Sequence, residues 1–333
     1  MRRAVTALSL VALTLGCSAS QSEPSAIDPS PAAAPTSTAT TAGPTAAAPR
    51  QTASRAPIPT ATTPRPTMNA RAALRDIRHL ATEIGPREAT SPNFAEAAAF
   101  VENRFEGLGY EVRRTKVRVP AGNSWGTPVR RGTSVNVIAE PVGFNASKPH
   151  VVVGAHLDTV PVAPGAEDNA SGIAVMLQLA AMAKQQPAGL PVQFIAFGAE
   201  EPRGSGDALH HFGSRQHVAT LNRTERRAVQ AMVALDRVGV GASYVPVCTA
   251  NSRGNRVRDD LRMAARRADI ATRTCTNFTS DHWSYAKASI PAVRLGSIPY
   301  AGYHSRGDVA SVVDRRQLDR VGRAVWAWLR TLN

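Results

Sequence analysis

The chain has 333 residues, of which 43% are hydrophobic, and a formal net charge of +14. This length and apolar content are enough for one large domain with extensions. Residues 1–67 contain five arginines and two acidic residues, which leaves +11 for the rest of the chain. No basic run there is interleaved with aromatic residues, so we expect no nucleic-acid partner. A basic surface also suits an anionic cell envelope or acidic substrates.

The N-terminus has the pattern of a bacterial export signal. Two arginines precede an apolar run, residues 4–16, that is too short to span a bilayer and is typical of a signal peptide. The run ends in a Gly-Cys pair at Cys17 that resembles a lipoprotein box, although Thr14 stands where leucine is usual. We therefore predict a signal peptide with a lipobox in residues 1–17, and a lipid on Cys17 that anchors the exported protein to the cell membrane, facing outside. The alternative is ordinary secretion, with Cys17 removed or free.

The next segment, residues 18–67, consists almost wholly of Ala, Pro, Thr and Ser. Such a composition cannot bury enough apolar surface to offset the entropy lost on ordering, so we expect disorder. The segment would form a tether between a lipidated Cys17 and a folded domain in residues 68–333.

Residues 68–333 alternate between helical and strand patterns. Apolar residues at helical spacing predict a first helix that ends at Gly85, and Asp314 is expected to cap the last helix. Short runs rich in Val, Ile and Phe predict buried strands. The expected helices are 74–84, 94–108, 169–186, 254–268 and 314–329, and the expected strands are 111–119, 134–140, 151–156, 192–197, 231–235 and 291–295. Strands that alternate with helices predict an α/β fold with a largely parallel sheet.

Three consecutive predicted strands, in residues 151–235, end in acidic or histidine residues. Ligands bind outside the carboxyl ends of the strands in open α/β sheets, so these residues predict a site at one edge of the sheet. Asp168 adds a carboxylate at the predicted start of a helix, where the helix dipole favours an anion. The residues at the strand ends are His156, Asp158, Glu200, Glu201 and Asp236.

Each of these residues alone has a simpler interpretation, such as a structural histidine, a helix cap or a solvated turn. Together, so many carboxylates at one edge would repel one another unless a cation holds them. Oxygen ligands combined with imidazole suit zinc or a similar divalent ion. The pattern as a whole therefore predicts a metal site.

Two cysteines remain if Cys17 carries a lipid. In an exported protein Cys248 and Cys275 are expected to form a disulfide, and the alternative is a pair of buried thiols. Neither has the CxxC spacing of a zinc site, so we do not expect either to bind metal.

The motif series GAHLD, PGAEDNASG, AFGAEE, ALDRVG, SDHWSYAKASIPAV and YHSRGD resembles that of the di-zinc aminopeptidases of the M28 peptidase family. The resemblance covers residues 68–333, with the motifs in the family's order and at its intervals. It implies a three-layer α/β/α fold of the zinc-peptidase (phosphorylase/hydrolase-like) type, with a mostly parallel central mixed sheet. It also implies a peptidase domain in residues 68–333 that holds two Zn²⁺ ions.

The resemblance also implies a role for each site residue. Asp168 would bridge the two zinc ions, and Glu200 would be the general base. Asp158 would not bind metal but would orient the ring of His156, as carboxylates behind metal ligands do. The remaining ligands would be His156 for one ion, His304 for the other, and Glu201 and Asp236 to complete the two sets.

The chain departs from the family's pattern in three places. Glu167 replaces the first aspartate of the usual Asp-Asp pair, although Asp168 keeps the bridging position. Residues 202–212 intervene where the family runs quickly to a Gly-Ser pair, which leaves substrate specificity open. The residue that stabilises the oxyanion could be any of three tyrosines, of which we favour Tyr303 because it precedes His304. The inserted residues expected near the mouth are Arg203, Asp207, His210 and His211, and the other tyrosines are Tyr285 and Tyr300.

The expected function is that of an exported, monomeric zinc aminopeptidase acting on peptides with a free N-terminus. One alternative is a glutaminyl cyclase, which shares the scaffold but holds one zinc ion and transfers an amine within its substrate. The others are a carboxypeptidase-like relative and a binding domain without catalytic activity. A non-catalytic domain would be expected to lose ligands, and here every ligand type and the base are present.

Overall fold

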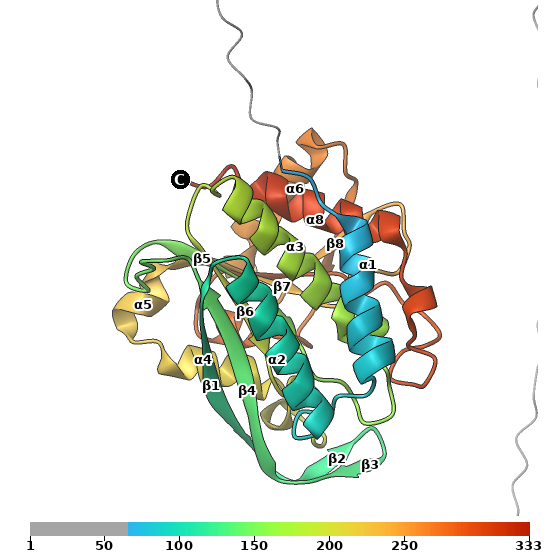
Figure 1. Ribbon diagram of the computed structural model, residues 1–333. Helices are drawn as coiled ribbons and strands as arrows, with labels where there is room; N and C mark the ends of the chain where they lie inside the picture. The colour runs from blue at the N-terminus through green and yellow to red at the C-terminus, as the bar shows by residue number, and fades with distance from the viewer. Residues whose placement is uncertain (1–65) are drawn as a thin grey trace, which may run out of the picture. The chain divides into compact units, whose positions relative to one another are not determined.

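The computed structural model describes residues 66–333 (Figure 1). The predicted signal peptide, Cys17 and nearly all of the predicted tether lie outside the described residues. Within the part that is described, no helix has both the length and the apolar character needed to cross a membrane.

An eight-stranded mixed sheet forms the centre of the fold, in the order β1-β4-β6-β5-β7-β10-β8-β9. The pairs β6–β5, β5–β7, β7–β10 and β8–β9 are parallel, and the other three are antiparallel. The strands are β1 (Glu111–Val119), β4 (Gly132–Glu140), β5 (His150–His156), β6 (Val192–Phe197), β7 (Val229–Leu235), β8 (Val245–Thr249), β9 (Thr272–Thr276) and β10 (Ala292–Leu295). The six predicted strands and the α/β class are confirmed, and β8 and β9 were not predicted.

Helices cover both faces of this sheet, so the predicted three-layer architecture is confirmed (Figure 1). Because both faces are buried, β5 has an almost continuous apolar sequence. Its residues Val151, Val153 and Ala155 face the helices of one side, whereas Val152 faces those of the other. One layer contains α1 (Ala70–Arg78), α2 (Pro92–Gly107), α3 (Gly172–Gln185), α6 (Asn255–Arg267) and α8 (Arg315–Leu329), and the other contains α4 (Phe212–Thr220) and α7 (His282–Lys287).

The helix ends follow the local signals in the sequence. The first predicted helix forms α1 and a π-helical continuation, η1 (His79–Ile84), and it stops at Gly85, whose φ of 79° favours glycine. Asp314 caps α8 as predicted, because its side chain accepts a hydrogen bond from the backbone N–H of Arg316. The helices α4 and α7 were not predicted. Neither were the short helix α5 (Arg223–Ala228) and the hairpin of β2 (Gly122–Ser124) and β3 (Thr127–Val129).

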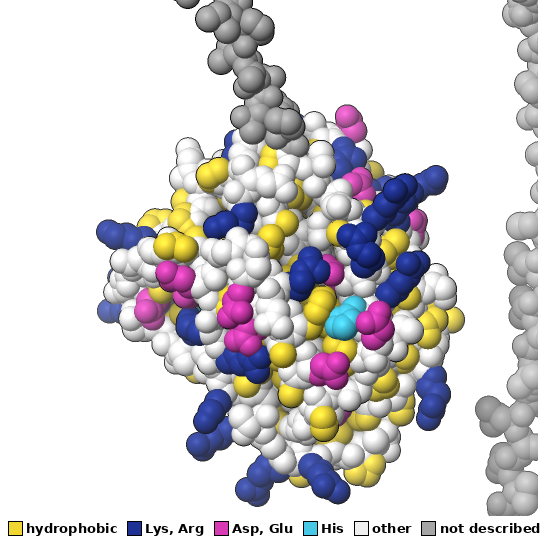
Figure 2. All heavy atoms as spheres, viewed as in Figure 1, with side chains coloured by type: hydrophobic (Ala, Val, Ile, Leu, Met, Phe, Trp, Pro, Cys, Tyr) yellow, Lys and Arg dark blue, Asp and Glu magenta, His cyan; other side chains and the backbone are white. Residues whose placement is uncertain are grey.

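The arginine-rich helix α6 turns its charged side to solvent. Val257 and Leu261 are buried on its inner side, whereas Arg256, Arg266 and Arg267 are exposed. On the face of the molecule seen in Figure 2, acidic side chains lie among the basic ones. The arginines of α6 therefore form a solvated helix face.

The predicted bond between Cys248 and Cys275 is present and links the parallel neighbours β8 and β9. The two residues are 27 positions apart, and closing a loop of that length is worth about 3 kcal/mol in the chain-entropy model. We expect the double variant Cys248→Ala/Cys275→Ala to lose about that much free energy of unfolding in urea titrations. Reductant should destabilise the wild type similarly and leave the variant unchanged. Equal stability of variant and unreduced wild type would contradict this prediction.

Candidate metal centre

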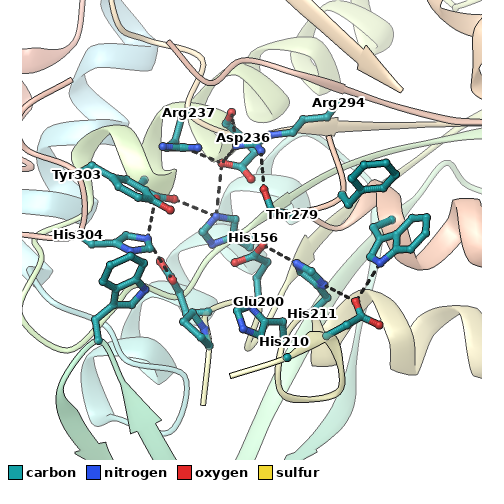
Figure 3. A pocket seen from close by; sticks show the side chains of 18 residues that line it. His156, Glu200, His210, His211, Asp236, Arg237, Thr279, Arg294, Tyr303 and His304 are labelled. Carbon is teal, nitrogen blue, oxygen red and sulfur yellow. Dashed lines mark hydrogen bonds and ion pairs between the residues drawn. The ribbon is translucent and has the colours of Figure 1, made fainter. Parts of the chain in front are cut away.

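Three neighbouring parallel strands, β6, β5 and β7, deliver acidic and histidine side chains to one edge of the sheet. His156 is the last residue of β5, and Asp236 directly follows β7. Glu200 and Glu201 follow the end of β6. The loop after β10, the next strand in the sheet, adds His304 (Figure 3). These residues and Asp168 line one cavity of about 420 Å³.

The candidate ligands form two groups that share Asp168. In the first group, His156 Nε2 lies 3.1 Å from Asp168 Oδ1 and 3.8 Å from Asp236 Oδ1. In the second, His304 Nε2 lies 3.2 Å from Asp168 Oδ2 and 3.3 Å from Glu201 Oε2. Each carboxylate oxygen of Asp168 therefore belongs to a different group, as expected for a residue between two ions.

These separations suit tetrahedral coordination. Zinc with ligands at about 2.0–2.1 Å holds neighbouring ligand atoms about 3.3 Å apart. Glu201 Oε1 and His304 Nδ1 are buried and have no hydrogen-bond partner among the described residues. The donor set of imidazole nitrogens and carboxylate oxygens therefore fits zinc in both composition and spacing.

Burial and neighbouring charges perturb the titration of several groups in the centre. Burial, together with neighbouring carboxylates, raises the pKa of both Glu200 and Glu201 to about 8. Burial would lower the pKa of His304, but the charge of Glu201 and contacts with Asp168 raise it to about 10. These shifts favour the protonated forms of Glu200, Glu201 and His304, and bound cations would instead favour the deprotonated forms.

Asp168 is held by contacts that the sequence pattern did not reveal. Its backbone φ and ψ are not helical, and α3 begins at Gly172, three residues later than predicted. The Asp308 carboxylate accepts hydrogen bonds from the backbone N–H groups of Glu167 and Asp168, at 2.8 and 3.0 Å. The Asn169 side chain accepts a hydrogen bond from the Gly172 N–H and donates one to a carbonyl of β7. Asp168 therefore sits in a braced turn before the helix.

The carboxylate of Asp158 has a different main contact from the one implied by the resemblance. His156 Nδ1 lies 3.1 Å from the backbone carbonyl oxygen of Asp158 and 3.7 Å from its carboxylate. That carboxylate accepts hydrogen bonds from the backbone N–H groups of Glu200 and Glu201, at 3.0 and 3.1 Å. The main chain of Asp158 thus holds the histidine ring, and its side chain holds the Glu-Glu pair.

Glu200 and Glu201 point to different parts of the centre, although they are adjacent in sequence. Glu201 approaches His304 and also lies in a group with His156 and Asp168, whereas the Glu200 carboxylate lies in a group with His156 and Asp236. The ligand atoms of each group are within 4.8 Å of one another. The chain turns sharply before the pair, where Ala199 has a φ of 59°. The two side chains are therefore free to have separate roles.

The substituted residue Glu167 does not face the cavity. Its buried carboxylate accepts hydrogen bonds from the backbone N–H groups of Gly239 and Val240, in the loop that follows Asp236. The longer side chain thus connects the turn that holds Asp168 to the loop after β7.

Several residues near the centre were not found by sequence reasoning. Arg294 in β10 is buried and its Nη2 lies 3.0 Å from Asp236 Oδ1; an arginine within an apolar strand was the available signal. Asp281 is buried near Glu200, and burial raises its pKa to about 7. Arg87 is fully buried and donates to main-chain carbonyls, including those of Leu157 and Gly165 on the loop between β5 and Asp168. Nothing in the local sequence of Arg87 indicated these long-range contacts.

The inserted segment and the favoured tyrosine also border the cavity. Asp207, His210 and His211 line it, whereas Arg203 turns away to pair with Glu88 and does not. Tyr303 stacks on the His304 ring with centroids 3.7 Å apart. Other lining residues are Trp125, Phe278, Thr279, Trp283, Arg237 and Arg294.

Comparison with known proteins gives a family match over more than half of the chain. The model of peptidase family M28 matches residues 136–329. Aminopeptidase YwaD of Bacillus subtilis is 32% identical over 206 residues, which are 59% of this chain and 44% of YwaD. The probable lipoprotein aminopeptidase LpqL of Mycobacterium tuberculosis is 27% identical over 195 residues, which are 55% of this chain and 37% of LpqL. The matches thus span less than half the length of these two relatives.

Solved structures share the fold at low sequence identity. BSAP, a zinc aminopeptidase from Bacillus subtilis, superposes with a TM-score of 0.71 at 20% identity, over 80% of this chain and 95% of BSAP. Glutaminyl cyclase from Bacteroides thetaiotaomicron superposes with a TM-score of 0.69 at 19% identity, over 81% of this chain and all of the cyclase chain. These likenesses confirm the predicted fold.

Proposed function

The chain belongs to peptidase family M28, and from that membership we propose that it is an exported aminopeptidase with two zinc ions. The observation that carries the proposal is the pair of imidazole–carboxylate groups that share Asp168, with Glu200 beside them. YwaD and BSAP, which are named aminopeptidases, support the choice of reaction.

The residues of the chain have separable roles in this reaction. His156, Asp168 and Asp236 would hold one zinc ion, and Asp168, Glu201 and His304 the other. Bound zinc would lower the pKa of the attacking water and polarise the scissile carbonyl.

Glu200 is the residue that moves the proton. Its carboxylate lies in the cavity beside the ligands, where it takes a proton from the attacking water and passes it to the leaving amine. The Asp158 carboxylate accepts a hydrogen bond from the backbone N–H of Glu200 and thereby fixes the position of the Glu200 backbone. The aromatic and acidic residues around the mouth leave room for a substrate whose N-terminal amine faces the carboxylates.

The test is a substrate panel. The zinc-loaded protein should release nitroaniline from aminoacyl-nitroanilides and should leave their N-acetylated forms intact. An acetylated amine has no positive charge to interact with the carboxylates, and the acetyl group is too bulky to fit beside them. Cleavage of blocked and free substrates at equal rates would contradict aminopeptidase activity. Release of C-terminal residues instead would show a carboxypeptidase-like reaction.

A glutaminyl cyclase is the second candidate, favoured by the similarity of fold to the Bacteroides enzyme. Cyclisation of N-terminal glutamine by a protein that holds one zinc ion would support it. A binding domain without activity is the third candidate, and it would cleave none of the substrates. The complete second group of ligands around His304 favours the hydrolase.

We also propose that the protein is tethered to the membrane through Cys17 and acts as a monomer. The apolar run before Cys17 motivates the tether, and the lipoprotein name of LpqL supports it. The Cys17→Ser variant should move from the membrane fraction to the soluble exported fraction, because it lacks the thiol that carries the lipid. A wild-type protein that is already fully soluble outside the cell would contradict the anchor.

A further inference from the structure

The inserted segment, residues 202–212, returns the chain to the Glu-Glu pair. The His211 N–H donates to the Glu200 carbonyl at 2.9 Å, and the Phe212 N–H donates to the Ala199 carbonyl at 2.8 Å. His211 adopts a φ of 56°, a left-handed conformation that is uncommon for a residue with a side chain. The backbone of His211 is therefore fixed directly against that of Glu200.

This backbone arrangement brings the His211 ring to the Glu200 carboxylate. The residue is 3% exposed, and its Nε2 lies 3.3 Å from Glu200 Oε1 (Figure 3). No other histidine, arginine or lysine side chain of residues 66–333 is within 4.0 Å of that carboxylate. His211 thus pairs its Nε2 with one oxygen of the carboxylate that we propose moves the proton.

The far side of the ring faces a second acid that is itself anchored. Asp207 Oδ1 lies 3.9 Å from His211 Nδ1. The Asp207 carboxylate accepts hydrogen bonds from Trp283 Nε1 at 2.9 Å and from Lys287 Nζ at 2.5 Å, both on α7. The insertion is therefore fastened to α7 through Asp207, the acid that lies beside the His211 ring.

We propose that His211 is a positioning residue for Glu200, supplied by the inserted segment. A carboxylate that moves a proton must present one oxygen to the attacking water in a fixed orientation. Because His211 Nε2 pairs with Oε1, Oε2 is the oxygen left to face the water. The expected effect of His211 on kcat rests on the proposed function. The effect of His211 on the position of the Glu200 side chain does not, because that position can be observed without any reaction.

The experiment compares two substitutions in the full-length protein. His211→Leu removes the ring and its donor, whereas His211→Gln places an amide N–H at a similar reach. His79→Leu is the matched control, because His79 is a partly exposed histidine that pairs with Glu83. For each protein, kcat, KM, zinc content, thermal midpoint and a crystal structure would be determined.

We expect His211→Leu to lower kcat about 10- to 100-fold, the range for a hydrogen bond to a charged group, with KM and zinc content unchanged. His211→Gln should restore most of the loss, and His79→Leu should show none. In the crystal structure of His211→Leu, the Glu200 carboxylate should leave its wild-type position.

Two results would overturn the proposal. One is a His211→Leu variant with wild-type kcat and Glu200 in place. The other is a loss of kcat in His211→Leu that His211→Gln does not restore, together with a loss of zinc or with a thermal midpoint lowered equally in these two variants. Such a result would show that His211 has a structural role. If the wild type cleaves no substrate, the proposed function fails, and the position of Glu200 in the two crystal structures still decides the role of His211.

Discussion

Replacing Glu200 by glutamine is expected to lower kcat by at least about 100-fold, the lower range for removal of a general base. Glutamine has nearly the same shape and keeps the side chain in the cavity, but its amide cannot accept the proton of the attacking water. The hydrogen bond from the Glu200 N–H to Asp158 does not involve the side chain and should remain. Steady-state kinetics on a cleaved aminoacyl-nitroanilide would measure the loss.

Zinc content distinguishes this explanation from a loss of metal. Because Glu200 is not assigned to either group of ligands, the Glu200→Gln variant should bind as much zinc as the wild type. Near-wild-type turnover in this variant would contradict the mechanism. Loss of a zinc ion would show that Glu200 is a ligand. Glu200 is close enough to His156 and Asp236 for this role.

The same substitution at Glu201 is expected to have a different effect. Glu201 Oε2 lies 3.3 Å from His304 Nε2, and its Oε1 is buried without a partner among the described residues. An amide in this place would weaken a direct metal contact, so zinc affinity of the group around His304 should fall by more than about 100-fold, the upper range for residues that only support ligands. Turnover should fall with it.

The two variants form a matched pair, because they make the same chemical change in adjacent residues. Metal analysis after dialysis, with kcat measured at saturating zinc, would compare them directly. Full metal content in Glu201→Gln, together with metal loss in Glu200→Gln, would reverse the two assignments.

The sequence was sufficient to locate the site because the signal is local. Buried strands have apolar sequences, so His156, Glu200 and Asp236 were recognisable as polar residues at or just after strand ends. The order β6-β5-β7 then places these ends side by side, as the expected parallel sheet required. The disulfide was predictable from the number of cysteines, since only two remained after Cys17.

The supporting contacts were not predictable, because they join distant parts of the chain. Asp308 holds the backbone of Asp168 across 140 positions, and Glu167 reaches Gly239 across 72. The late start of α3 has the same origin, since the Asn169 side chain bonds to Leu235 and Gly172 instead of continuing a helix. Local patterns of hydrophobicity contain no information on such pairs.

The strands β8 and β9 were missed for a further reason. β9 lies at the edge of the sheet, and its five residues are partly exposed and polar, so they lack the apolar signal of a buried strand. β8 is buried, but it is short and contains Pro246, which weakens a strand pattern.

If two zinc ions share Asp168, each chain must take up two of them, and a zinc titration measures this number. Metal-free protein would be titrated with zinc while bound metal and hydrolysis of an aminoacyl-nitroanilide are both measured. We expect two zinc ions per chain in the wild type, with full activity only after the second is bound, and loss of both sites in the Asp168→Asn variant. Saturation of binding and activity at one zinc ion per chain, or an Asp168→Asn variant that keeps two zinc ions, would contradict it.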